Sequence, residues 1–242
     1  MQTIDNLTGV FFGRTLVQQR GEIGGAKSVF VKMQGQKNEL VFFPYGGVVK
    51  NPPKGAFKFY AGDLIEYRTN DDGLKPEIYL LKTYKVKSGT GTTVKIYRDG
   101  YKHIPFVGDV LMKAPEEIGG TGDEAYDITK VVATKDGGDN VWELTFSTAM
   151  GTLTEGDVLV EAESNSATGT MLVKNINGVA PYDYDFLYAP TSDGSDDDFE
   201  AARYFLVPAA GGEMFKNKMS PIPPCVEKLN ESNVNGWFKI QH

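Results

Sequence analysis

The chain is poor in the side chains that most catalytic and metal sites require. Among its 242 residues are one cysteine, Cys225, and two histidines, His103 and His242. A single cysteine excludes an intramolecular disulfide, so the fold does not require an oxidising compartment. A structural zinc site needs about four ligands, mostly Cys and His, and a Ser or Cys nucleophile normally needs a histidine base. The composition therefore indicates a protein that is not an enzyme and that holds no metal or other cofactor.

The remaining candidates for chemistry each have a plainer interpretation. His103 lies in the segment 99–105, which is typical of a loop between strands, so a surface or capping role is favoured over catalysis. Cys225 lies between Pro224 and Val226, and nothing in the sequence indicates a lowered thiol pKa, so we expect a buried or half-buried small side chain. The acidic run 193–198 is the best calcium candidate, but it lacks EF-hand spacing, and we expect a solvated loop that caps a helix. The glycine-rich segment 119–122 lacks the Lys-Ser/Thr of a phosphate loop.

The chain also lacks long hydrophobic runs and clustered positive charge. No apolar stretch approaches the roughly 20 residues of a membrane span, and the N-terminus has neither the basic nor the apolar region of a signal peptide. The formal net charge is −7. The longest basic run, residues 82–87, alternates as one charged face of a strand would, whereas nucleic-acid binding requires clustered Lys and Arg. We therefore expect neither a membrane nor a nucleic acid as a partner.

Glycine and aromatic residues are abundant. The 28 glycines exceed the usual share of roughly 7%, and they show no triplet period. Such an excess is typical of a chain with many turns and few long helices. The 12 tyrosines and 14 phenylalanines favour strands. These features predict a mainly β fold.

Three segments differ in pattern. Residues 1–56 form an N-terminal segment, in which strands at 29–33 and 39–43 predict a hairpin. Residues 57–178 form the central domain. Residues 179–242 form an aromatic and acidic C-terminal segment. In that last segment we expect one short helix over 198–206, an extended stretch over 221–224, and a terminal strand or docking peptide over 236–240.

The central domain has evenly spaced strand patterns separated by turn signals. We expect strands over 57–60, 64–68, 78–86, 92–97, 110–113, 128–133, 141–146, 158–161 and 171–174. Short strands at this spacing predict an all-β barrel or sandwich.

A Gly-Asp step recurs before three of these strands. The three pairs are Gly62-Asp63, Gly108-Asp109 and Gly156-Asp157. Glycine suits a left-handed turn position, and an aspartate side chain can close the turn by accepting backbone N–H groups. A recurring turn into a barrel strand is favoured over three cation-binding aspartates. The spacing is also compatible with a duplicated barrel unit.

Large aromatic residues are the candidate interface. Four of them alternate at period two, so they share one face of an extended segment; this face either belongs to the core or docks on a partner chain. Phenylalanines near the N-terminus and a Trp-Phe pair near the C-terminus raise the same question. The candidates are Phe11, Phe12, Tyr182, Tyr184, Phe186, Tyr188, Trp237 and Phe238.

The segment from Ser147 to Val160, together with the Gly-Asp strand starts, resembles head proteins of tailed bacteriophages. The likeness is to head-fibre and capsid decoration (auxiliary capsid) proteins, including those of crAss-like phages of gut Bacteroidales hosts, and it covers mainly residues 56–178. It implies a small β-barrel or β-tulip body on the capsid exterior, without catalytic residues. It further implies a homodimer or homotrimer that is made in the host bacterial cytoplasm and binds the major capsid protein. Residues 1–56 and 179–242 match no such pattern, so the contacting segment stays open.

The leading hypothesis is a virion structural protein that decorates the capsid or forms the base of a head fibre through protein–protein assembly. A carbohydrate-binding or adhesion module that uses Trp142 or Tyr182 is the first alternative. A tail or baseplate component with a similar barrel is the second. A hydrolase with paired carboxylates is the third, although this acidic sequence singles out no pair.

Overall fold

The computed structural model describes the central part of the chain almost continuously and several short stretches of both ends. The described residues are 30–32, 47–52, 58–60, 62–69, 76–98, 103–122, 124–180, 184–185, 187–190, 197–201, 213–215, 219–232 and 239–241. Within them the fold is mainly β, as the composition predicts.

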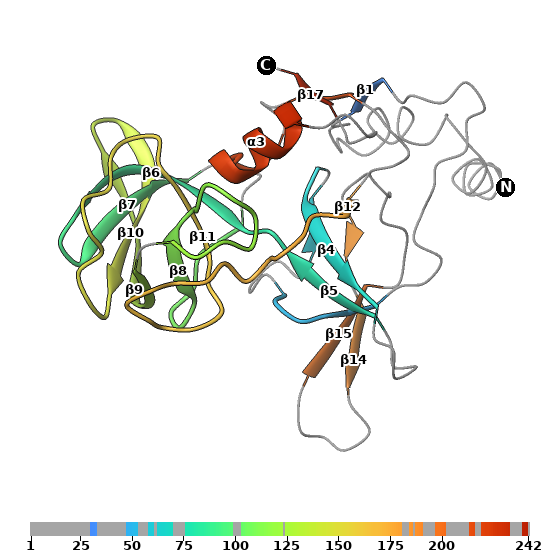
Figure 1. Cartoon of the computed structure of the whole chain (residues 1–242). Coiled ribbons are helices and arrows are strands. Elements are labelled where there is room, and N and C mark those ends of the chain that lie inside the picture. Colours follow the sequence, from blue (N-terminus) through green and yellow to red (C-terminus); the bar gives the residue numbers. More distant parts are fainter. Residues whose placement is uncertain are drawn as a thin grey trace, which may run out of the picture.

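Six antiparallel strands close into a barrel (Figure 1). They are β6 (Thr83–Thr90), β7 (Thr93–Tyr97), β8 (Val110–Lys113), β9 (Ala125–Asp136), β10 (Asp139–Phe146) and β11 (Val158–Glu161). Around the barrel the order is β10-β7-β6-β11-β8-β9. The strands β8, β9 and β10 follow one another as neighbours and β11 returns beside β8, which is a Greek key. Closure leaves the barrel without an edge strand.

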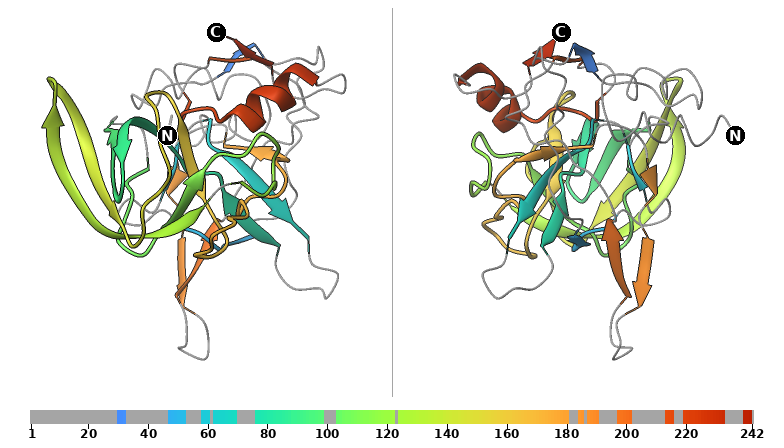
Figure 2. Two further views of the ribbon diagram at one scale, coloured as in Figure 1. Left: turned by 60° about the vertical axis from the view of Figure 1, so that its left-hand side comes forward. Right: turned by 90° about the vertical axis from the view of Figure 1, so that its right-hand side faces the viewer.

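The barrel interior is filled by side chains that alternate along the strands. In β7, buried Val94 and Ile96 alternate with partly exposed neighbours. Leu111, Leu144 and Leu159 are fully buried in the same cluster. The hairpin β9–β10 is long and rises past the other barrel strands (Figure 2). Period-two burial therefore produces a barrel, one of the two architectures that the strand spacing predicts.

A second, six-stranded sheet lies beside the barrel. Its order is β12 (Gly178–Val179), β4 (Leu64–Arg68), β5 (Glu77–Leu80), β2 (Gly47–Val49), β15 (Asp197–Ala201) and β14 (Leu187–Pro190). Only β2 and β5 pair in parallel within it. The β14–β15 hairpin projects away from the barrel (Figures 1 and 2). All three sequence segments contribute to this sheet, while the closed barrel takes residues 83–161.

Two smaller sheets use the remaining described strands. β3 (Lys58–Phe59) pairs with β13 (Tyr184–Asp185). β1 (Phe30–Lys32), β16 (Glu213–Phe215) and β17 (Lys239–Gln241) form the other, in the order β1-β16-β17. The strand expected over 29–33 is thus present, and its described partner is β16. The second strand of the expected N-terminal hairpin, 39–43, lies outside the described residues.

The helix expected over 198–206 is wrong in its described part. Residues up to Ala201 belong to β15, which pairs with β14 on one side and β2 on the other. Pairing on both sides overrides the weak helix preference of this acidic stretch. The run 193–198 therefore leads into a strand rather than capping a helix; residues 193–196 and 202–206 lie outside the described part.

The helix of the C-terminal segment lies further along, at α3 (Pro224–Ser232). Its start was expected to be extended because of the neighbouring prolines. Proline suits the first helical position, where its missing N–H has no partner to lose. The carbonyl of Pro223 accepts hydrogen bonds from Val226 N and Glu227 N at 2.9 and 3.1 Å. No helix in the described part of the chain is long and apolar enough to cross a membrane.

Two further expectations about strands are corrected. The strand expected over 78–86 is divided at Leu81 and Lys82, so that β5 enters the six-stranded sheet and β6 enters the barrel. Residues 171–174 form no strand, and Met171 makes only an isolated bridge to Ala162. Side chains of Glu66 and Arg68 on β4 instead bind backbone groups of this segment.

One apolar cluster joins barrel, sheet and helix. It contains Leu64 of the sheet, Met112 and Val160 of the barrel, and Cys225 and Val226 of α3. Figure 1 shows α3 above the region where the barrel meets the six-stranded sheet. Burial of this shared cluster holds the barrel, the six-stranded sheet and α3 together.

Candidate functional site

The three Gly-Asp steps form the same turn. The glycine φ angles are 89°, 90° and 96° for Gly62, Gly108 and Gly156. In each turn the aspartate N–H donates to the carbonyl three residues earlier, at 2.9 to 3.1 Å. In each turn the aspartate Oδ2 accepts the N–H of that same earlier residue at 2.8 Å. Glycine is therefore favoured at the third turn position because the backbone φ angle there is positive.

Each turn also pairs with one residue of a neighbouring segment. The glycine N–H donates to the carbonyl of that residue, whose own N–H donates to the aspartate carbonyl. The partner is Ala180, Ile128 or Val86, and all six distances lie between 2.8 and 3.0 Å. The prediction of a recurring turn before a strand is confirmed. The turns at Gly108 and Gly156 lead into barrel strands, whereas the turn at Gly62 leads into β4 of the six-stranded sheet. One oxygen of each aspartate carboxylate is occupied by a backbone N–H, which favours the structural role over a cation site.

Alanine at Gly108 is expected to lower the free energy of unfolding by about 1–2 kcal/mol, because an L-residue is strained at positive φ. A Cβ there meets no atom within 4 Å, so the effect comes from the backbone alone. Gly151→Ala is the matched control, since Gly151 is equally open but has no positive φ. Urea unfolding should show Gly151→Ala unchanged or slightly more stable; equal losses in both variants would contradict the turn assignment.

Buried ionisable residues gather where the barrel meets the six-stranded sheet, which makes this junction the candidate functional site. We define the junction by Asn51, Asp63, Lys82, His103, Glu161 and Ser220.

His103 is fully buried, not at the surface as its loop position suggests. Its Nε2 lies 3.0 Å from Oδ2 of Asp63, and the two side chains are 0% and 1% exposed. The Tyr60 ring lies 5.2 Å from the imidazole, centroid to centroid. Ser220 Oγ donates to the other oxygen of Asp63 at 3.5 Å. Asp63 thus stands between the serine and the histidine, so this arrangement differs from a Ser-His-Asp triad, in which histidine activates the serine.

Lys82 is the second buried charge at the junction. Its Nζ lies 2.6 Å from Glu161 Oε1, with side-chain exposures of 4% and 11%. Asn51 Nδ2 donates to the other Glu161 oxygen at 2.6 Å. Asn51 also exchanges two hydrogen bonds with the backbone of Leu80, at 2.7 and 2.8 Å. The division between β5 and β6 therefore carries a buried ion pair that links β11 to the six-stranded sheet.

The placement of Lys82 also changes the expectation for the basic run 82–87. Lys82 is buried, whereas Lys85 is exposed on the barrel. Lys87 on β6 forms an ion pair with Asp139 on β10, at 2.7 Å. The run was expected to form one solvated, charged strand face. Only Lys85 and Lys87 fit that expectation, and the charge of Lys87 is paired with Asp139.

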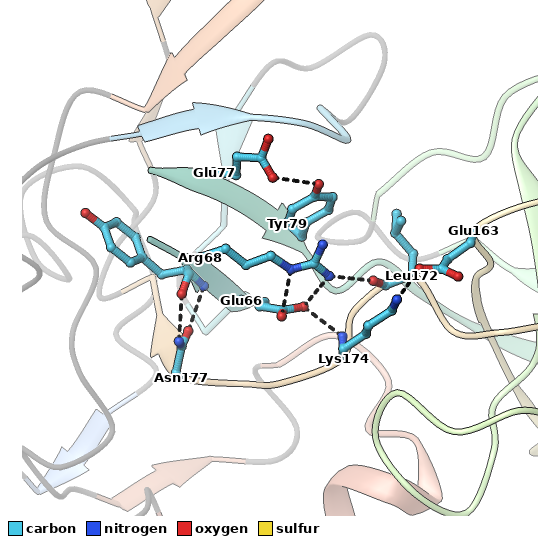
Figure 3. Close-up of polar contacts among 9 residues, drawn as sticks. Glu66, Arg68, Glu77, Tyr79, Glu163, Leu172, Lys174 and Asn177 are labelled. Atoms are coloured by element: carbon cyan, nitrogen blue, oxygen red, sulfur yellow. Dashed lines mark hydrogen bonds and ion pairs between the residues drawn. The ribbon is translucent and has the colours of Figure 1, made fainter. Parts of the chain in front are cut away.

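A third polar cluster covers β4 (Figure 3). Arg68 donates to both oxygens of Glu66 at 2.8 and 2.9 Å, and its guanidinium lies 3.9 Å from the centroid of the Tyr79 ring. Glu66 also accepts the backbone N–H of Lys174 at 2.7 Å. Arg68 Nη2 reaches the carbonyl of Leu172 at 3.1 Å. Both oxygens of Glu66 are thus occupied, which leaves this buried carboxylate poorly suited to act as a base or nucleophile.

The same cluster explains why 171–174 is not a strand. The N–H groups of Met171 and Leu172 still donate to backbone carbonyls, at Gly120 and Glu161. The Leu172 carbonyl and the Lys174 N–H are bound instead by the side chains of Arg68 and Glu66, so no strand ladder continues through the segment. Asn177 continues this pattern by exchanging two hydrogen bonds with the backbone of Tyr67, at 2.7 and 2.8 Å.

A hollow of about 470 Å³ lies among loops of the barrel and is lined in part by Lys113, Glu124, Thr152 and Thr168. Lys113 is already paired with Asp157 at 3.0 Å. Burial raises the pKa of Asp157, but hydrogen bonds from Thr154 and Lys113 outweigh that effect and hold this pKa below its ordinary value. The positive charge at the hollow is therefore partly neutralised.

The glycine-rich segment 119–122 packs tightly against residues 169–174. A Cβ on Gly119 would lie 2.8 Å from Lys174 Cα. The N–H of Gly122 donates to Gly169 O at 2.9 Å, and that of Gly120 to Glu117 O at 3.0 Å. These N–H groups serve the fold, in agreement with the absence of a phosphate-loop motif.

The candidate interface aromatics fall mostly outside the described part of the chain. Those outside are Phe11, Phe12, Tyr182, Phe186, Trp237 and Phe238. Tyr184 lies in β13, opposite Phe59 of β3. Tyr188 lies in β14, opposite Phe199 of β15. The two described candidates therefore belong to strands paired within the chain, and the expected single extended segment contains parts of two sheets.

The other two residues weighed for function, Trp142 and Cys225, are both packed into the fold. Trp142 packs against the barrel cluster, and the Arg98 guanidinium lies 4.6 Å from its ring centroid. Cys225 is buried, and burial raises the pKa of its thiol to about 11. No group of three or more His, Cys, Asp or Glu side chains suited to a metal ion occurs among the described residues.

The buried pairs His103–Asp63 and Lys82–Glu161 are not predicted by the sequence pattern. The residues around His103 show neither the helical nor the strand periodicity that would indicate burial, and Asp63 lies 40 residues away in the sequence.

In comparisons with known proteins, no family model, curated protein or solved structure matches this chain.

Proposed function

We propose that this chain is a virion structural protein that decorates a phage capsid or forms the base of a head fibre. The observation that carries the proposal is the place of the resembling segment in the fold. Residues 147–154 connect β10 to β11, and residues 156–160 supply a Gly-Asp turn and most of β11. The likeness to phage head proteins thus coincides with the strand that closes the barrel between β6 and β8.

The polar clusters support an assembly role. At the junction and on β4, buried ionisable side chains link segments far apart in sequence: Lys82 with Glu161, His103 with Asp63, and Glu66 with the backbone of Lys174. Buried pairs of this kind hold a defined arrangement of parts. A body in which barrel, sheet and helix are fixed relative to one another suits a protein that binds a regular lattice at many equivalent positions.

Binding to capsid shells tests the proposal. The purified chain is mixed with shells assembled from the major capsid protein of the same genome and centrifuged through a sucrose gradient. We expect the chain to co-sediment with the shells, and the bound amount to reach a plateau as more chain is added. Light scattering of the free chain should show a homodimer or homotrimer. Shells from an unrelated phage are the control. A chain that stays at the top of the gradient with both shells would contradict the proposal.

The carbohydrate-binding alternative gains no support from Trp142. An exposed aromatic face is what a sugar ring would stack on, yet Trp142 is partly buried in the barrel cluster with Arg98 close to its ring. A glycan array separates the two functions. Specific, saturable glycan binding without capsid binding would favour the adhesion module over the virion protein.

A further inference from the structure

The strand β9 continues past the closed ring of the barrel. It pairs with β8 through residues 125–127, and the bonds of Ile128 to the turn before β8 end this contact. Over residues 130–136 the strand pairs with β10 alone among the described strands. Figure 2 shows the β9–β10 hairpin extending beyond the other barrel strands. One edge of β9 is therefore open over residues 130–136 in the described part of the chain.

The pairing pattern fixes which backbone groups lie on this open edge. Within an antiparallel sheet, the backbone groups of successive residues point alternately to one neighbouring strand and to the other. The Asn140 carbonyl accepts the N–H of Arg98, the residue after β7, so every second residue of β10 from Asn140 onward bonds toward β7. The β9 residues opposite them are Lys135, Ala133 and Val131. Their N–H and C=O groups therefore point away from β10, and they have no partner among the described residues.

The open edge is exposed and apolar in part. All residues from 129 to 136 are exposed or half-buried. Val132 is 37% exposed, and Val107, which is 58% exposed, precedes the glycine whose N–H bonds Ile128. These are two of the three large apolar side chains that are exposed in the described part of the chain, so exposed apolar surface gathers at this edge. An open strand edge of this kind is a template for pairing with another strand.

A second copy of the chain fits this edge around a two-fold axis. Residues whose backbone groups face the partner must lie opposite one another in an antiparallel pair. With the axis at Ala133, this residue faces its own copy, and Val131 faces Lys135 of the second copy. Each facing pair exchanges both of its hydrogen bonds, so every open backbone group of the three residues gains a partner. Between them, Val132 lies opposite Thr134 at the closer spacing, where β-branched side chains pack well.

Charge complementarity selects this register. Lys130 lies opposite Asp136 of the second copy on both sides of the axis, again at the closer spacing, where opposite charges stabilise a sheet. Sliding one copy by two residues in either direction places Lys130 opposite an uncharged residue. Asp136 is 3.6 Å from Lys95 and 3.8 Å from Lys87 within its own chain. Both distances are too long for hydrogen bonds, so the Asp136 carboxylate can still accept one from Lys130.

We propose that the open edge of β9 pairs with the same edge of a second copy, which joins two β9–β10 hairpins into one continuous sheet across a two-fold dimer. Lysines on an edge strand commonly deter pairing. Here Lys130 meets a carboxylate, and Lys135 lies on the other face, where its flexible stem can extend to solvent.

The dimer surface depends on the described hairpin and not on the proposed virion role. A chain that dimerises through β9 without binding capsid shells would contradict only the proposed function. A chain that binds shells as a monomer would contradict only the dimer.

Ala133→Pro tests the edge. It removes an N–H that points away from β10 and leaves the bonds between β9 and β10 in place, and proline is tolerated at such edge positions. We expect sedimentation velocity over a concentration series to show a dimer for the parent. The dissociation constant of the variant should be about tenfold higher or more, because the lost N–H occurs twice in the dimer.

Ala133→Ser is the matched control, since it keeps the N–H and nearly the same size, and it should dimerise as the parent does. A parent chain that stays monomeric at every concentration would overturn the proposal. Shell binding that is lost in Ala133→Pro would then assign the edge to a strand of the capsid protein.

Two charge variants test the register and also decide the matter if Ala133→Pro does not fold. Lys130→Asp places two carboxylates opposite each other, and Asp136→Lys places two ammonium groups opposite each other, so each variant alone should be monomeric. Mixing the two variants restores both opposite-charge pairs, and we expect a heterodimer. Lys135→Glu lies on the same strand but on the other face, and this control should dimerise as the parent does. A mixture that stays monomeric, or a single variant that dimerises as tightly as the parent, would overturn the proposal.

Discussion

Replacing Lys82 with methionine is expected to lower the free energy of unfolding by about 3 kcal/mol. Methionine matches the length of the lysine stem but leaves the carboxylate of Glu161 buried without its cation. Removing one partner of a buried ion pair typically costs about 3–5 kcal/mol. The lower end applies here because Asn51 still donates to Glu161. Urea unfolding followed by tryptophan fluorescence measures the change.

Two further variants separate the buried charge from general packing. The double variant Lys82→Met with Glu161→Gln removes both charges, and we expect it to recover most of the lost stability. Lys228→Met is the exposed control. Lys228 pairs with Glu116 at the surface, with side-chain exposures of 55% and 81%. Loss of this pair should leave the urea concentration at the unfolding midpoint unchanged. A double variant no better than Lys82→Met would contradict the role assigned to the pair.

Leu159→Ala is expected to be the other strongly destabilising change, at about 3 kcal/mol. Leu159 is fully buried in the barrel. It lies on the strand that pairs with β6 on one side and β8 on the other, opposite Tyr84 and Lys113. Leucine-to-alanine changes in cores cost about 2–5 kcal/mol through lost burial and the cavity left behind. The same unfolding measurement applies.

Val132→Ala is the matched control for the barrel core. Val132 lies on β9 and is 37% exposed, so its truncation should change the free energy of unfolding by about 0.5 kcal/mol or less. A loss for Leu159→Ala no greater than that for Val132→Ala would mean that β11 does not close a packed barrel.

Many strands and turns of the barrel and of the adjoining sheet were predictable from the sequence. Three strands have the expected bounds, at 64–68, 110–113 and 158–161, and each follows a Gly-Asp turn. These elements depend on local signals, since period-two burial and a glycine at positive φ are both visible in a few residues. The mainly β class followed from the same signals, which left a barrel and a sandwich both open.

Elements that depend on distant partners were not predictable. The stretch 78–86 has one continuous strand pattern, and its division at Leu81 and Lys82 arises because β5 and β6 pair in different sheets. β15 is a strand because β2 and β14 flank it, although its acidic start favours a helix. By contrast, α3 had a local signal, the proline at its first position, which the proline-rich context obscured.

The junction was beyond local sequence signals for the same reason. Asp63 was expected only to close a turn, and it does so, but it also receives His103 and Ser220 from distant segments. Lys82 was assigned to a solvated face and is buried beside Glu161, 79 residues away. Pairs of this kind are determined by how the sheets pack, and one sequence alone contains no measure of that packing.

The most direct test of the proposed function is the protein content of virions. Gradient-purified particles of the phage that encodes this chain are analysed by quantitative mass spectrometry. We expect the chain to be present at a fixed, high ratio to the major capsid protein and to remain with the particles after tails are removed. Absence from virions that contain their other head proteins, or loss together with the tails, would contradict it.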